Sequence, residues 1–361
     1  ECDHPGYDET TRKCTRCGCD LAAVITKDDK KTGYVTFAEA LAAAQTEENK
    51  GCTLKLLVDV NEKVAVKTGS LTLDATERTI NGALNVGNGA ALTVQKGTVN
   101  GNVICAKGGS LNATRTKFGG TVNCVGNGNF ESAEFKKTVN LKGPLAQMSY
   151  SALRGDLNVS GTAVLRGAYA EGNITVNSGG YLKLHAFNCT GSVLAKANSK
   201  LFISGTKFDC TVTAEFGCTF TAAGEVGQTL FIQNVAVREN TDITLESGVQ
   251  FGEITVAGRL IDYLKAGTAL KDLNTDNIID GRVGIAGNVQ VVEHTHACVW
   301  KTDTHEKLCG CGYVAETDTT APVISGIADG KTYYGAIEFG VADENDFTVT
   351  VDGKTVQLTL G

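Results

Sequence analysis

The chain has 361 residues, more than one typical globular core needs, so it predicts either several structural units or one elongated unit. Its formal net charge is −7 and no stretch is dense in Lys and Arg, which disfavours nucleic acid and other polyanions as partners. Gly is abundant, with 43 residues, and Pro is rare, with 3, which is typical of many short strands joined by tight turns. We therefore expect a mostly β protein.

No apolar run approaches the ~20 residues that cross a bilayer, so we expect no membrane insertion in this segment. The chain starts at Glu1 in polar sequence and stops at "VDGKTVQLTLG", which reads as part of a β unit, so a longer parent protein is expected. The 13 cysteines cannot all pair within one chain because their number is odd. Some of them must be thiols or metal ligands.

Residues 1–20 predict a small Cys/His knuckle. Its "CTRCGC" contains Cys-x-x-Cys-Gly, which is typical of half a zinc knuckle, and a segment with so little core needs a crosslink. The candidate ligands are Cys2, His4, Cys14, Cys17 and Cys19.

Residues 21–50 predict a helix that acts as a lid. Thr36 can cap a helix with Phe37, Leu41 and Ala44 on one face, and Gly51 would end it. A stack of parallel strands needs such a lid, because its open end exposes apolar side chains and unpaired strand edges.

Residues 51–293 contain a repeat of 17 to 19 residues, with segments that start at Gly82, Gly101, Gly120, Lys137, Gly155, Gly172, Gly191 and Cys210. Two apolar columns follow each start, and the residues between the columns are mostly polar, which is the alternation of a strand with one buried face. The first column is Leu84, Val103, Val122, Val139, Leu157, Ile174, Val193 and Val212, and the second is Val86, Cys105, Cys124, Leu141, Val159, Val176, Ala195 and Ala214. A further column near the tenth place is Leu92, Leu111, Phe130, Leu165, Leu182, Leu201 and Phe220, with Met148 out of step.

No single repeat can bury its own apolar residues. Stacked repeats can, as the coils of a parallel β-solenoid with at least two short strands per coil. Residues 251–292 predict the closing strands and cap.

The phrases "YVTFAEALAAAQ", "CTLKLLVDV" and "LTLDATERTING" resemble the start of right-handed parallel β-helix regions in large secreted or surface proteins of Gram-positive gut bacteria. The resemblance implies a right-handed solenoid, a short capping helix and a secreted or cell-surface location.

Within the solenoid, Cys105 and Cys124 predict a buried ladder of thiols. Neighbouring strands lie ~4.8 Å apart, and a disulfide needs its Cβ atoms closer. The other cysteines there, Cys52, Cys189, Cys210 and Cys218, show no ligand-like spacing, and His185 predicts a turn or surface residue.

An enzyme of the polysaccharide lyase or glycoside hydrolase class is the alternative for a β-helix. Such an enzyme would place carboxylates together on one outward ladder. The six acids between Gly82 and Ala223 share no register: Glu131, Glu134, Asp156, Glu171, Asp209 and Glu215. Exposed aromatic residues for a sugar are sparse, with Tyr150, Tyr169 and Tyr181 as candidates.

Residues 294–318, around "HTHACVWKTDTHEKLCGCG", predict a second Cys/His module. Thiolates and imidazoles on a Gly-punctuated loop can form a tetrahedral zinc site. The candidate ligands are His294, His296, Cys298, His305, Cys309 and Cys311.

The same stretch resembles short Cys/His modules of bacterial surface proteins, which implies matching roles for His296, Trp300, His305, Cys309 and Cys311. Its closing Cys pair has one intervening residue where the commoner form has two. Disulfides such as Cys298–Cys309 or Cys2–Cys14 stay open as an alternative, and so does a catalytic metal with Glu306 as base. Trp300 is expected to form the small core of the module.

Residues 319–361 follow the linker residue Pro322 and predict a partial β-sandwich that resembles bacterial immunoglobulin-like modules. The two faces would come from Ile337, Phe339 and Val341 and from Phe347, Val349 and Val351.

These features together predict a non-enzymatic extracellular scaffold or adhesion module with structural zinc, which binds a glycan or a host or bacterial surface protein and no nucleic acid. The polysaccharide-active enzyme is the runner-up. A third alternative is a metal-scavenging or redox-sensing surface protein.

Overall fold

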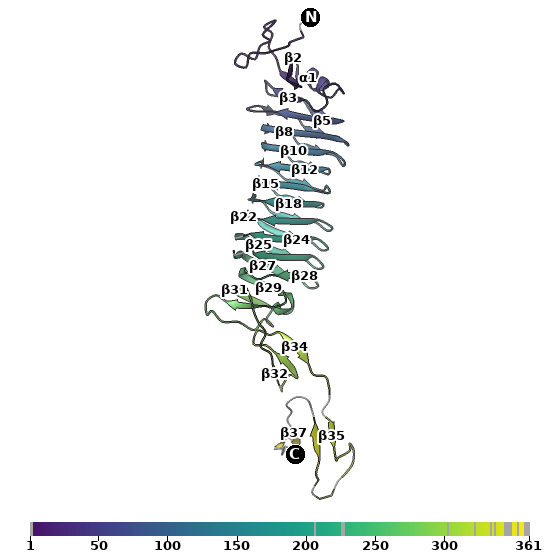
Figure 1. The fold of residues 1–361 in the computed structure, drawn as a ribbon, viewed down its shortest axis with the longest axis vertical. Helices are drawn as coiled ribbons and strands as arrows, with labels where there is room; N and C mark the ends of the chain where they lie inside the picture. Colours follow the sequence, from purple (N-terminus) through teal and green to yellow (C-terminus); the bar gives the residue numbers. More distant parts are fainter. Residues whose placement is uncertain are drawn as a thin grey trace.

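The protein is a long rod of stacked strands, with the N-terminal knuckle at one end and the C-terminal segments at the other (Figure 1). The computed structural model describes residues 3–205, 207–224, 228–301, 303–320, 323–332, 334–335, 337–342, 349–351 and 354–356. No helix in this part of the chain is long and apolar enough to cross a membrane. The architecture is an all-β parallel β-solenoid, as the repeat predicts.

Each complete coil contributes strands to three faces, so the coil has one more face than the minimum that the sequence requires. Face A consists of β4 (Val64–Val66), β7 (Leu84–Val86), β9 (Val103–Cys105), β11 (Val122–Cys124), β14 (Val139–Leu141), β17 (Leu157–Val159), β20 (Ile174–Val176), β23 (Ser192–Ala195), β25 (Lys207–Ala214), β27 (Leu230–Val237) and β29 (Val249–Val256). Every neighbouring pair on this face is parallel.

Face B consists of β3 (Thr53–Leu56), β5 (Gly69–Asp74), β8 (Ala90–Val99), β10 (Ser110–Phe118), β12 (Asn127–Glu131), β15 (Ala146–Ser149), β18 (Thr162–Arg166), β21 (Tyr181–His185), β24 (Lys200–Gly205), β26 (Thr219–Gly224) and β28 (Asp242–Leu245). Face C consists of β6 (Thr79–Ile80), β13 (Glu134–Phe135), β16 (Ala152–Leu153), β19 (Tyr169–Ala170) and β22 (Asn188–Cys189). The long strands β8 and β10 continue from face B round the corner to face C, so the two faces form one hydrogen-bonded sheet.

The two columns predicted for face A are confirmed. Leu84 pairs with Val103 and Val86 with Cys105, and the same register continues coil by coil to Val212 and Ala214. These side chains belong to one continuous buried core.

The predicted third column is wrong at Phe130 and Leu165. Leu111 pairs with Gly128, whereas Phe130 pairs with Ala113 and Met148, and Met148 pairs with Leu165. The corner between faces A and B has four residues after Cys105 but only two after Cys124 and two after Val159. In the two coils with the shorter corner, the tenth residue of the repeat therefore lies one inward position further along the face B strand than in the coil of Leu111. A Cβ on Gly128 would lie 2.7 Å from the Phe130 ring, which fills the space that Leu111 fills one coil earlier.

A column of glycines lets the coils approach closely at the corner between faces C and A. A Cβ on Gly101 would lie 2.1 Å from the carbonyl oxygen of Gly82, and a Cβ on Gly120 would lie 2.3 Å from that of Gly101. A side chain at Gly101 or Gly120 would push adjacent coils apart, which explains the glycines at these two repeat starts.

Antiparallel strands and a helix lie at the N-terminal end of the stack. Strand β1 (Ala23–Lys27) pairs with β2 (Lys30–Tyr34) and with the first face B strand, β3. Helix α1 (Phe37–Ala44) buries Phe37, Ala40 and Ala44 in the solenoid core, and the Thr36 hydroxyl accepts a hydrogen bond from the Glu39 backbone N–H, as an N-cap does.

Helix α1 ends at Ala44 rather than near Gly51. The Gln45 side chain donates to the Ala65 carbonyl (3.0 Å) and accepts from the Lys67 backbone N–H (2.9 Å). These two bonds hold the residue after the helix against β4 and the residue that follows β4. The Thr46 and Asn49 side chains both donate to the Ala43 carbonyl, which satisfies the end of the helix within turns.

At the other end, the parallel ladder stops at β29. The 3-10 helix η1 (Leu260–Tyr263) and strand β30 (Thr268–Asp272) follow, and β31 (Ile285–Glu293) pairs antiparallel with both β29 and β30. The free edge of face A is therefore hydrogen-bonded to an antiparallel strand.

Beyond the solenoid, β32 (Val299–Lys301), β33 (Glu306–Leu308) and β34 (Val314–Thr317) form a small antiparallel sheet. Strand β35 (Val323–Ser325) pairs with β36 (Gly340–Ala342), and β37 (Val349–Val351) pairs with β38 (Lys354–Val356). Val323 and Ile324 are 65% and 56% exposed, so the described residues of this segment form two strand pairs without a buried sandwich core. Phe347 lies outside the described residues, and the immunoglobulin-like module stays a prediction.

A disulfide joins Cys189 in β22 to Cys210 in β25, two residues to which the sequence assigned no role. Their Cα atoms are 5.8 Å apart, within the usual range for a disulfide. The spacing of neighbouring strands does not forbid such a bond, because side chains on adjacent coils can lean toward each other. Cys105 and Cys124 are buried thiols, as predicted.

Phe130→Ala tests the packing of the core. Phe130 is fully buried, and its ring lies 6.1 Å from that of Phe118 and 5.2 Å from that of Phe135. We expect the substitution to lower the free energy of unfolding by about 3–5 kcal/mol, because it removes a buried ring and leaves a cavity. Chemical denaturation would measure the change.

The matched control is Tyr150→Ala, since Tyr150 is 74% exposed. It should change the free energy of unfolding by less than about 0.5 kcal/mol. Equal effects of the two substitutions would contradict the placement of Phe130 in the core.

Candidate metal centres

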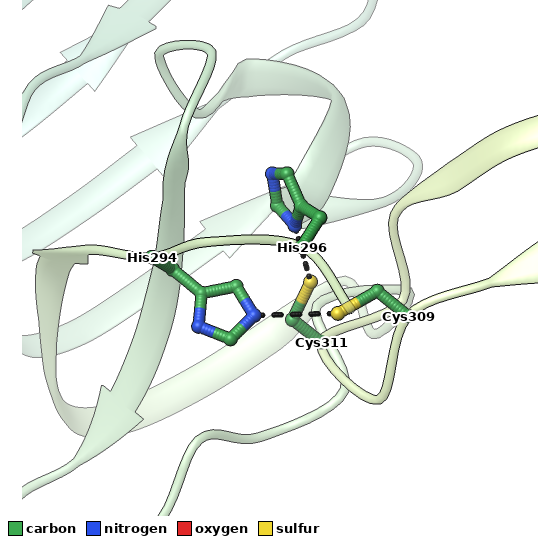
Figure 2. A group of neighbouring side chains, drawn as sticks. All are labelled: His294, His296, Cys309 and Cys311. Atoms are coloured by element: carbon green, nitrogen blue, oxygen red, sulfur yellow. Dashed lines mark hydrogen bonds between the residues drawn. The ribbon is translucent and has the colours of Figure 1, made fainter. Parts of the chain in front are cut away.

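A cluster of two histidines and two cysteines lies where the solenoid ends and the small antiparallel sheet begins. His294 directly follows β31, and His296 lies in the extended segment before β32. Cys309 directly follows β33, and Cys311 lies in the turn before β34. The four side chains point toward one another (Figure 2), and each offers one ligand atom within 4.8 Å of the others.

The distances between these atoms fit a tetrahedral metal ion. The His294 Nε2 and Cys309 Sγ atoms are 3.3 Å apart, and so are the His296 Nδ1 and Cys311 Sγ atoms. A tetrahedral zinc ion with Zn–S bonds of about 2.3 Å and Zn–N bonds of about 2.0 Å would hold N and S about 3.5 Å apart. Both cysteines are buried and both histidines half-buried, so the four ligands would enclose the ion.

The electrostatics of the cluster favour one thiolate before any metal binds. Burial opposes ionisation of Cys309, but hydrogen bonds from the Cys311 backbone N–H and from His294, His296 and Cys311 lower its pKa to about 6. Burial and the neighbouring Cys309 raise the pKa of Cys311 to about 11. A divalent cation would favour the thiolate of both residues, because thiolates are the metal-binding form.

Contacts around the cluster hold its ligands in place. The His296 ring stacks on Tyr313 with centroids 4.2 Å apart, which restricts the orientation of the imidazole. The His294 backbone N–H donates to the Gly267 carbonyl, and the Gly281 backbone N–H donates to the Cys311 carbonyl, both at 2.8 Å. These bonds join the module to the end of the solenoid.

Not every predicted ligand joins this cluster. His305 lies on an exposed turn with a φ of 54°, apart from the four ligands. Cys298 is half-buried beside Cys309, and its pKa is raised by burial and by the Cys309 charge and hydrogen bond. The structure leaves Cys298 and Cys309 as separate thiols, so it does not contain the alternative disulfide between them.

The expectation for Trp300 is wrong. Its ring is half-buried with the Lys307 ammonium 6.0 Å from the ring centroid, and it is absent from the buried cluster. Ala269 of β30 packs against Cys309 and Cys311 instead. The module therefore buries its cysteines against the solenoid rather than around its own tryptophan.

A second cluster forms in the N-terminal knuckle from His4, Cys17 and Cys19. The His4 Nδ1 atom is 3.4 Å from Cys17 Sγ and 3.5 Å from Cys19 Sγ, and the two sulfur atoms are 3.2 Å apart. Cys14 adjoins the cluster. Burial opposes its ionisation, but hydrogen bonds from the Cys17 and Arg16 backbone N–H groups and from the His4 and Cys17 side chains lower its pKa to about 6.

Cys14 is buried against Leu21, Val24 and Leu57, so the knuckle packs on the first strands of the fold. With Cys14 as a fourth donor, the knuckle offers three sulfur atoms and one imidazole, a ligand set that suits zinc. Cys2 lies outside the described residues.

The six acids between Gly82 and Ala223, all in the described part of the chain, include no three whose carboxylates lie within 4.8 Å of one another. Glu134 and Glu171 both pair with Arg154, whose guanidinium lies 5.7 Å from the Tyr169 ring centroid. In the part of the chain that the structure describes, three or more potential metal ligands come together in two places, and these are the two Cys/His clusters.

The sequence did not single out a cavity of about 610 Å³ at the corner that follows face A. It is lined by Ala197, Glu215, Phe216, Val237, Arg238, Glu239, Thr255, Val256 and Ala257. Phe216 is 59% exposed there, and Glu215 accepts a hydrogen bond from the Ala197 backbone N–H. Only the coiling brings Glu215 and Glu239 together, since they lie on successive coils.

Metal analysis of the purified chain tests the two clusters. We expect about two zinc ions per chain, one for each cluster, because each offers about four soft donors. Cys311→Ser should remove one ion. The matched controls His305→Ala and Cys298→Ser should retain both, because neither side chain belongs to the set of four.

The loss of metal should follow pH. Metal should be released as the pH falls, because protons compete with the ion for the Cys309 and Cys311 thiolates and for the two imidazoles. A chain without metal and with few free thiols would contradict the assignment and indicate disulfides.

Comparison with known protein families, with curated proteins and with solved structures finds no match to this chain.

Proposed function

We propose that the chain is a non-enzymatic scaffold module of a secreted or cell-surface bacterial protein, in which zinc fastens small modules to both ends of a rigid β-solenoid. The observation that carries the proposal is the cluster of His294, His296, Cys309 and Cys311 at the junction between two structural units. Four protein ligands fill a tetrahedral ion, whereas a catalytic zinc keeps one position for water or substrate. A closed site of this kind favours a structural role over catalysis or metal scavenging.

Three further features support an extracellular scaffold. The buried Cys189–Cys210 disulfide is the kind of bond that persists in oxidising compartments. The core continues without a break from the N-terminal helix to β31, which gives a rod with little internal freedom. Phe37, Ala40 and Ala44 bury the inner side of α1 against this core, which suits the proposed role of α1 as the lid.

The proposal includes the finer expectations from the sequence. The solenoid is right-handed, as crossover connections between parallel strands nearly always are. The segment from 319 onward belongs to an immunoglobulin-like module, and the parent is a Gram-positive surface protein. Its role is adhesion or architecture, with a glycan or a surface protein as partner.

Removal of zinc tests the scaffold role. A chelator should loosen residues 294–318 while the solenoid keeps its structure, because the module has little core of its own and the solenoid has a continuous one. Hydrogen exchange should therefore increase in that segment and stay slow in the face A strands, and Cys311→Ser should reproduce the pattern without chelator. Unchanged exchange in residues 294–318 would contradict the proposal.

The runner-up function is a polysaccharide-active enzyme, and the cavity with Glu215 and Glu239 is the observation that favours it. Two carboxylates in one cavity could act as acid and base on a glycosidic bond. Under the scaffold proposal, we expect no release of reducing ends or unsaturated products from a panel of neutral and acidic polysaccharides. Release that Glu215→Gln or Glu239→Gln abolishes would replace the scaffold proposal with the enzyme.

A further inference from the structure

The outer side of face B carries a local excess of positive charge. Strands β15, β18, β21, β24 and β26 contain Arg166, Lys183, His185 and Lys200 but no Asp or Glu. This excess is unexpected because the whole chain has a formal charge of −7. We define the basic strip as Arg166, Tyr181, Lys183, Lys200 and Phe202.

The strand register arranges the strip diagonally across face B, because each of its three cations lies on a different outward column. Arg166 pairs with His185, Lys183 with Phe202, and Tyr181 with Lys200. One permanently charged side chain therefore lies on each of three successive coils, whose strands are ~4.8 Å apart.

Two aromatic rings lie beside these cations. The Lys183 ammonium is 5.4 Å from the Tyr181 ring centroid and 5.8 Å from the Phe202 ring centroid. The His185 ring is 5.5 Å from that of Phe202, and its Nδ1 atom is 2.6 Å from the Ser204 hydroxyl. Tyr181, Lys183 and Phe202 are all half-buried, so the rings lie close to the sheet instead of projecting from it.

The charges of the strip are not neutralised within the fold. No ion pair joins Arg166, Lys183 or Lys200 to an acid in the described part of the chain, where twelve other pairs form. The nearest acids on these outward columns are two coils away: Glu131 lies beyond Ser149 from Arg166, and Asp242 lies beyond Thr219 from Lys200. Three available cations with two flat rings form a surface suited to an anionic, partly apolar partner.

We propose that the basic strip binds an acidic polysaccharide that lies diagonally across the strands of face B. The carboxylates or sulfates of the polymer would pair with Arg166, Lys183 and Lys200, and the C–H faces of its sugars would rest on Tyr181 and Phe202. This site goes beyond the scaffold role, because it gives the rod a ligand of defined chemical class.

The structure favours a polysaccharide over other polyanions. A nucleic acid duplex brings two phosphates with every base pair, and tight binders commonly contact six to ten of them. The strip offers about three fixed cations in a chain that is negative overall, which suits a polymer with one charge on each sugar or every second sugar. A membrane surface would favour protruding apolar side chains, whereas both rings here are half-buried.

The experiment is titration calorimetry of the full chain with an oligogalacturonate and with a chondroitin sulfate oligosaccharide at low salt. Methyl-esterified oligogalacturonate serves as the neutral probe, because it keeps the sugars and removes the charge. We expect binding to at least one acidic probe, no binding to the neutral one, and weakening as salt rises.

Variants of the five strip residues test which of them bind the ligand. Arg166→Gln, Lys183→Gln and Lys200→Gln each remove one charge and should weaken binding about threefold, or about thirtyfold when combined. Tyr181→Thr and Phe202→Thr should weaken binding without changing its salt dependence. Thr162 and Thr219 share the Tyr181 column and Thr221 shares the Phe202 column, so the sheet accepts threonine there.

The matched control is Lys117→Gln, which removes an exposed charge from the face C end of β10 and should leave binding unchanged. The proposal is overturned if neither acidic probe binds, or if the triple variant binds as tightly as the Lys117→Gln control. It is also overturned if single-stranded DNA or phosphatidylserine vesicles bind more tightly than the oligosaccharides with the same dependence on the strip, because another polyanion would then be the ligand.

Discussion

The stacking of coils that cannot bury their apolar residues alone is the constraint on which the rest of the structure depends. Each coil offers a few inward side chains to a shared core, so every position on face A must match the coils on both sides. That requirement fixes the register from β4 to β29 and places small residues such as Gly101 where coils approach closely. The corners are free to vary in length because they lie outside this core.

The same constraint makes the two ends of the rod its weak points. A parallel stack cannot satisfy its last strands by repetition, and both ends change to antiparallel pairing, at β1 with β3 and at β31 with β29. The segments that follow have small cores, and there the Cys/His clusters appear. Metal coordination can supply the crosslink where too few apolar side chains meet.

The outward side chains do not pack in the core, so their polarity and charge can differ from coil to coil. On face A, Asn140 donates to Asn123 and Asn158 donates to Asn140, which gives a regular polar ladder. Face B instead changes from polar residues to the basic strip within a few coils, and the corner beyond face A opens into the cavity beside Phe216. A uniform core thus supports surfaces of different chemical character along one rod.

The sequence by itself determined the solenoid, its two face A columns, the Thr36 cap and the two regions of clustered cysteine and histidine, because these depend on local periodicity and spacing. Only the tertiary structure decided which residues meet across coils. It selected His294 with His296, Cys309 and Cys311 and left His305 aside, and it joined Cys189 to Cys210. The sequence also disfavoured polyanions since no stretch is dense in Lys and Arg, yet coiling brings Arg166, Lys183 and Lys200 onto three successive coils of one face. The physical reason is that a solenoid places residues 17 to 19 positions apart within ~4.8 Å, a proximity that linear spacing reveals only once the length of every corner is known.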